Sequence, residues 1–124
     1  GILPVPYSPL GGGLLTGKYT GTSPSGRLID DSRYAARYGQ DWMHQTARDL
    51  LALAETLGTD PATLAVAWAA AHPARPAPIL SARSAAQLAP SLAATRFEMT
   101  PGLYARIAAL SPRPAPATDR LEEA

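Results

Sequence analysis

The hydrophobic and polar positions between residues 41 and 110 follow the period of amphipathic helices. From about Asp41 to Leu57 apolar side chains recur every three or four positions, and Gly58 is a typical helix stop. Asp60, Ser84 and Thr100 are typical N-caps, placed before further apolar stripes. The pattern predicts four helices, over about residues 41–57, 61–72, 84–94 and 100–110.

Two short apolar runs without helical period, residues 2–7 and 77–80, predict buried strands. Because helices separate them in the chain, the strands are expected to be parallel. Pro4 and Pro6 have no N–H to donate and should weaken one side of the first strand's ladder. Two strands leave unpaired edges on both sides, and they offer too little sheet surface to bury the apolar faces of four helices. The sequence therefore predicts a piece of a larger α/β fold. The start at Gly1, directly before an apolar run, also suggests a fragment.

Composition narrows the classes of function. The chain of 124 residues is 46% hydrophobic and 17% charged, which is typical of a soluble globular protein. Its net charge of +1 gives no basic field for nucleic acid, and no apolar run is long enough for a membrane span. The absence of cysteine excludes disulfides and zinc–thiolate sites, and His44 and His72 have no metal-ligand spacing. We therefore expect no metal and, by default, a cytoplasmic location.

The stretch "YSPLGGGLLTGKYT", residues 7–20, suggests phosphate binding. Gly12 to Lys18 matches the spacing GxxxxGK of a triphosphate-binding loop. However, Tyr19 stands where a small hydroxyl should hold magnesium, and "TGTSPSG" cannot continue as the required helix. A dinucleotide fingerprint would need glycine at Thr16. On these residues alone, a flexible turn with a solvated Lys18 remains an open alternative.

The whole phrase resembles the segment after the seventh strand of the aldo-keto reductases. Three further stretches resemble later parts of that family in the same order: "DPATLAVAWAAAHP", "APILSARSAAQLAPSLAA" and "MTPGLYARIAAL". The resemblance covers residues 1–111 and implies the C-terminal part of a (β/α)8 TIM barrel. The expected fold is an incomplete α/β barrel with two parallel strands and about four helices. The proline-rich residues 112–124 are expected to form a mobile tail.

The resemblance implies that the parent protein reduces aldehydes and ketones with NADP(H). Tyr7 matches the aromatic residue that stacks on the nicotinamide ring. Ser8, Leu10 and Gly12 match the loop that follows the pyrophosphate, where glycine would let the backbone approach a phosphate closely. Lys18 matches a cation near the cofactor phosphates.

A second cluster is implied after the eighth strand. Ser81 and Arg83 match the turn that receives the adenosine 2′-phosphate, and a guanidinium suits this anion, which favours NADPH over NADH. Gln87 and Ser91 lie one helical turn apart and are expected to face the adenine. The family commonly has Gly at the position of Ser81 and Asn at that of Ser91. Pro90 is expected to unwind the turn that presents Ser91.

No catalytic residue is assigned. The family's tyrosine, lysine, aspartate and histidine lie on earlier strands, and Asp30, Tyr34, Lys18 and His44 match none of their motifs. The first hypothesis is therefore the cofactor-binding part of an NADP(H)-dependent reductase, inactive alone, whose small carbonyl substrate is not readable. The alternative is a non-catalytic nucleotide-binding or dimerising half-barrel module that self-associates through open strand edges.

Overall fold

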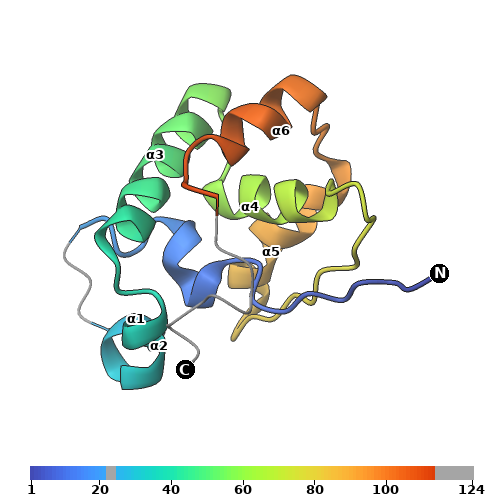
Figure 1. The fold of residues 1–124 in the computed structure, drawn as a ribbon. Coiled ribbons are helices and arrows are strands. Elements are labelled where there is room, and N and C mark those ends of the chain that lie inside the picture. The colour runs from blue at the N-terminus through green and yellow to red at the C-terminus, as the bar shows by residue number, and fades with distance from the viewer. Residues whose placement is uncertain (22–24, 114–124) are drawn as a thin grey trace.

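The computed structural model describes residues 1–21 and 25–113, and these residues are mainly helical (Figure 1). The expected tail lies outside the described residues from position 114 onward. The helices are η1 (Gly11–Thr16), α1 (Arg27–Asp30), α2 (Ser32–Arg37), α3 (Asp41–Leu57), α4 (Pro61–Ala70), α5 (Ala85–Ala93), η2 (Ala94–Arg96) and α6 (Pro101–Ala108).

The four helices predicted from the sequence are confirmed as α3, α4, α5 and α6. Gly58 ends α3 in the left-handed conformation, with φ of 66°. The side chains of Asp60, Ser84 and Thr100 cap α4, α5 and α6. Each accepts a hydrogen bond from a backbone N–H of the first turn, which would otherwise lack a partner. Local capping thus sets where these helices begin.

Helix α4 lies at the centre of the helical layer, in contact with both α3 and α5 (Figure 1). Its residues 61–67 are all buried, so it is covered on nearly every side rather than along one stripe. Leu64 is fully buried, while Trp68 stacks on Tyr104 of α6 with ring centroids 5.4 Å apart. The buried cluster that joins α3, α4 and α6 consists of Leu50, Leu53, Ala54, Leu64, Ala65 and Ile107.

The predicted strands are wrong, and with them the expected partial barrel: no strand forms among residues 1–21 and 25–113. Residues 2–7 and 77–80 do lie side by side (Figure 1), and the amides of Ala77 and Ile79 donate to the carbonyls of Pro4 and Pro6, each at 2.9 Å. The bonded residue numbers rise together, so the two segments run in the same direction. A parallel ladder also needs N–H donors in return from the residues that face the partner. Those residues are prolines, so only half of the ladder can form.

Two short helices, α1 and α2, lie in the polar excursion between the glycine-rich turn and α3, whose described residues are 20, 21 and 25–39. Leu28 of α1 is buried in a second cluster with Leu14 of η1 and Ala47 of α3. Asp31 caps α2 by accepting a hydrogen bond from the N–H of Arg33, and its carboxylate also forms an ion pair with the guanidinium of that residue, with an N–O distance of 3.1 Å. The arginine hydrogen bond lowers the pKa of Asp31 below its ordinary value. This excursion is therefore packed against the glycine-rich turn rather than extended from it.

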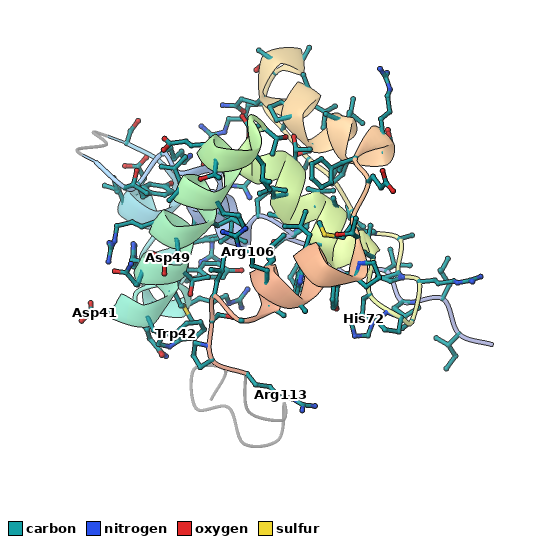
Figure 2. The ribbon with its side chains drawn as sticks, turned by 90° about the horizontal axis from the view of Figure 1, so that it is seen from above. Asp41, Trp42, Asp49, His72, Arg106 and Arg113 are labelled. Atoms are coloured by element: carbon teal, nitrogen blue, oxygen red, sulfur yellow. The ribbon has the colours of Figure 1, made fainter. Side chains whose placement is uncertain are left out.

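Large apolar side chains remain exposed along the two extended segments. These are Ile2, Leu3, Val5, Tyr7 and Ile79, and Ile2 is 95% exposed. In the view from above, Asp41 and Trp42 lie at one end of the molecule and His72 at the other (Figure 2). Within the described residues, no helix is long and apolar enough to span a membrane and no group of His, Cys, Asp or Glu could hold a metal ion.

Candidate functional site

A cavity of about 500 Å³ lies between the glycine-rich turn and the starts of α4 and α5. Its walls come from residues 7–18, from α1, from residues 60–62 and from residues 79–91. This volume is typical of small-molecule sites in proteins.

The cavity brings together every residue to which the sequence analysis gave a role in cofactor binding. The lining residues from the first segment are Tyr7, Ser8, Leu10, Gly12 and Lys18, and those from the second are Ser81, Arg83, Gln87 and Ser91. The two extended segments run in the same direction, so Tyr7 and Arg83 both follow ends that point toward the same cavity. Residues far apart in the chain thus share one surface.

The first wall is a turn built from left-handed residues. Gly11, Gly12 and Gly13 have φ of 57°, 65° and 99°, and Ser8 has φ of 54°. The N–H of Gly11 donates to the carbonyl of Ser8 at 2.9 Å, and that of Leu15 donates to the carbonyl of Leu10 at 3.1 Å. Three successive positive φ values are rarely accessible to other residues. This explains the three glycines without reference to a ligand.

Two of these glycines also make room for neighbouring side chains. A Cβ on Gly12 would lie 2.8 Å from Cδ1 of Tyr34, and one on Gly13 would lie 3.1 Å from Cε of Lys18. The ammonium of Lys18 lies over the ring of Tyr19, 4.9 Å from its centroid. The space beside Gly12 is therefore filled by Tyr34, which is a structural requirement separate from the approach of a phosphate.

Gly12→Ala is expected to destabilise the fold by about 2 kcal/mol, because alanine is strained at this φ and its methyl group would overlap Tyr34. Gly102→Ala is the matched control. No atom lies within 4 Å of its added Cβ, and alanine favours the helix by about 0.5–1 kcal/mol. Urea denaturation of both variants measures the difference. Equal stability of the two would contradict the packing described for Gly12.

The second wall is the start of α5. The Oγ atom of Ser84 accepts from the N–H of Gln87 at 3.2 Å, and Oε1 of Gln87 accepts from the N–H of Arg83 at 3.0 Å. This exchange resembles a capping box and leaves the amide NH₂ of Gln87 for other partners. The guanidinium of Arg83 is exposed beside the positive end of the helix dipole. Both features favour an anion at this end.

Ser91 is the buried polar group of this wall. It is only 3% exposed and lines the cavity. Pro90 does not unwind the helix, which continues to Ala93. The Pro90 carbonyl instead accepts a hydrogen bond from Oγ1 of Thr63 at 2.6 Å, which ties α5 to α4. This tie holds the turn that carries Ser91 at the cavity wall.

Two charged residues of the lining, Arg27 and Asp60, belong to neither of the clusters that the motifs predicted. Arg27 of α1 reaches the cavity, with its guanidinium carbon 5.6 Å from the ring centroid of Tyr34. Asp60 also lines it, but its carboxylate accepts from the N–H of Ala62 at 2.8 Å as the cap of α4. Among the described residues, the lining carries three cations, Lys18, Arg27 and Arg83, against one carboxylate, which suits an anionic ligand. The cap signal located Asp60 at the start of α4 but did not show that this end lines a cavity, and nothing in the sequence placed Arg27 there.

A smaller cavity of about 410 Å³ is lined by Leu28 and Ile29 of α1 and by Tyr19, Tyr38 and His44, among others. Burial raises the pKa of the Tyr38 phenol above its ordinary value of 10.0. The described lining residues of this cavity include no lysine or arginine, in contrast to those of the first cavity.

A cationic cavity built on a glycine-rich turn and a helix N-terminus is suited to a phosphate-bearing ligand. The comparison with known proteins agrees with the resemblance of its motifs: the model of the aldo/keto reductase family matches residues 1–112. The chain therefore belongs to the aldo/keto reductase family, and the match indicates an oxidoreductase. A search among curated proteins gave no match.

Proposed function

We propose that this chain forms the cofactor-binding part of an NADP(H)-dependent aldo-keto reductase. The observation that carries the proposal is the convergence of all nine residues of the family resemblance on one cavity. They come from residues 7–18 and 81–91, and no local pattern requires those two segments to meet. A dinucleotide has two ends and a charged bridge, so two separated polar clusters joined by a cationic turn fit its shape.

The phosphates would be held by groups from both walls. Arg83 and the N-terminus of α5 would receive the 2′-phosphate, because a guanidinium can donate two parallel hydrogen bonds to phosphate oxygens. Lys18 and Arg27 would contact the pyrophosphate beside the glycine turn. Ser91 adds a hydroxyl to this wall that can donate a hydrogen bond to a polar ligand or accept one from it.

The nicotinamide end would lie at Tyr7. This ring is 70% exposed at the mouth of the cavity, so one of its faces can stack on a planar ring without displacing a packed neighbour. When bound, NADPH supplies the hydride that reduces a carbonyl carbon. The contribution of Tyr7 would be to orient the ring and to keep water from that face.

The proposal gives this chain no proton donor. Tyr34 and Lys18 match no catalytic motif, and the ring of Tyr34 packs between Gly12 and Arg27. The donor and the small carbonyl substrate would belong to the complete reductase, since hydride transfer to a carbonyl needs a proton beside the nicotinamide.

Isothermal titration calorimetry with the 124-residue chain tests the proposal. We expect one NADPH to bind per chain, at least about tenfold more tightly than NADH, because only NADPH carries the 2′-phosphate for Arg83. We expect no NADPH oxidation when an aldehyde is added. Absence of saturable binding would refute the cofactor assignment, and turnover would refute the statement that the chain has no proton donor.

A second function is favoured by the exposed apolar side chains of the extended segments. Ile2, Leu3 and Val5 are each at least half exposed, and a non-catalytic nucleotide-binding module could cover them by self-association. Light scattering distinguishes this module from the cofactor-binding part of a reductase. A stable homodimer that binds nucleotide would support the self-associating module, and a monomer would argue against it.

A further inference from the structure

The cation that the sequence analysis missed is held by an aromatic ring. Arg27 is exposed at the rim of the cavity, and its long side chain would sample many rotamers without a partner. Its guanidinium carbon lies 5.6 Å from the ring centroid of Tyr34, within the range of a cation–π interaction. The position of Arg27 at the cavity therefore depends on where this ring is fixed.

The ring of Tyr34 is fixed by the glycine turn itself. Its Cδ1 and Cε1 atoms fill the space that a Cβ on Gly12 would need, and Leu28 packs beside it. Tyr34 belongs to α2, Arg27 to α1 and Gly12 to the cavity wall, so one ring joins three elements.

The second cation has the same kind of support. Lys18 lies over the ring of Tyr19, and the hydroxyl of Tyr19 accepts a hydrogen bond from the N–H of Leu28 at 3.3 Å. The two cations are thus each held by a tyrosine, and both tyrosines contact α1 or its side chains. This arrangement fixes two positive charges beside one glycine turn.

We propose that Tyr34 is a positioning residue for the anion site: it holds the Arg27 guanidinium at the cavity so that Arg27 and Lys18 together contact the diphosphate of the ligand. The inference rests on the proposed function, because it takes the ligand to be a dinucleotide. Tyr34 does not line the cavity and would act only through Arg27.

A double-mutant cycle on the full chain tests this role. Arg27→Ala is expected to weaken NADPH binding about tenfold, through the loss of a charged hydrogen bond to phosphate. Tyr34→Met keeps the apolar volume but removes the ring, and is expected to weaken NADPH about three- to fivefold. The double variant should bind no more weakly than Arg27→Ala alone, because Tyr34 acts through that residue. Tyr34→Phe should bind like the parent chain, since the hydroxyl has no part in the contact.

Two controls separate positioning from a general loss of structure. Tyr38→Met, in the same cluster, should leave NADPH binding unchanged. Adenosine 2′-monophosphate carries no diphosphate, so the Tyr34→Met variant should bind it like the parent chain. If Tyr34→Met does not fold, judged by circular dichroism, Tyr34→Leu replaces it in the cycle.

The outcomes are distinct. Additive losses in the cycle, parent-like NADPH binding by Tyr34→Met, or an equal loss for adenosine 2′-monophosphate would overturn the positioning role while leaving the cofactor site intact. A parent chain that binds no NADPH would overturn the proposed function and this inference with it.

Discussion

Arg83→Ala is expected to weaken NADPH binding about 100-fold, equivalent to roughly 2.7 kcal/mol, while NADH binding changes less than about twofold. The loss is large because a guanidinium can donate two charge-assisted hydrogen bonds to the 2′-phosphate, and NADH has only a hydroxyl there. The substitution should leave the start of α5 intact, since the Arg83 N–H still donates to Oε1 of Gln87. Calorimetric titration of both cofactors measures the change in preference.

The matched control for this prediction is Arg96→Ala. Arg96 is also exposed and lies in η2, close to α5 in sequence, but it does not line the cavity. Removing it changes the net charge by the same amount and should leave the affinity for both cofactors unchanged. If Arg83→Ala weakened NADPH and NADH equally, or no more than Arg96→Ala does, Arg83 could not be the 2′-phosphate ligand.

Leu64→Ala is expected to lower the free energy of unfolding by about 3 kcal/mol. Leu64 is fully buried in the cluster that joins α3, α4 and α6, so its truncation removes apolar burial and leaves a cavity that rigid helices cannot fill. A domain of ordinary stability has only about 5–15 kcal/mol in total, and the midpoint of thermal unfolding should fall by roughly 10 °C. Urea denaturation followed by circular dichroism provides the measurement.

Leu57→Ala serves as the control for the core. Leu57 closes the apolar stripe that the sequence predicted for α3, but the structure leaves it 43% exposed. Its replacement should change the free energy of unfolding by less than about 0.5 kcal/mol. Comparable losses for both variants would mean that the core is not centred on α4.

The sequence predicted the helices well because their ends are defined locally. Asp60 with Pro61, Ser84 and Thr100 are cap signals that depend on a few neighbouring residues, and each one caps a helix in the structure. The stripe of α3 was right except at its end, where Leu53 rather than Leu57 is buried. The spacing of apolar residues shows which face of a helix is buried. Where burial ends along that face depends on how far the neighbouring elements extend over it.

The strands could not be predicted in the same way, because a strand exists only through its partner. The apolar runs at residues 2–7 and 77–80 were expected to be buried parallel strands, and this was wrong: no strand forms among the described residues, and Ile2, Tyr7 and Ile79 are exposed. The two segments do lie side by side and run in the same direction. The two prolines that were expected to weaken one edge face the partner segment, and that is enough to prevent a ladder. The sequence shows that Pro4 and Pro6 have no N–H to donate. It does not show whether these two positions face the neighbouring segment or solvent.

The candidate site was also predictable only in part. Motif resemblance identified the residues that meet at the cavity, but it could not show what else they contact. Gly12 is needed for the ring of Tyr34, and Gln87 takes part in capping α5. Arg27 was missed because it comes from the excursion, where α1 and α2 are too short to leave a clear hydrophobic period.

Chemical-shift mapping of the ¹⁵N-labelled chain with NADP⁺ tests most directly whether one dinucleotide spans both walls of the cavity. The account predicts that amides of Gly11–Gly13 and those of Arg83–Ser91 shift together, with one common dissociation constant, while those of α6 do not move. Shifts confined to one wall, or two walls that titrate with different constants, would contradict it.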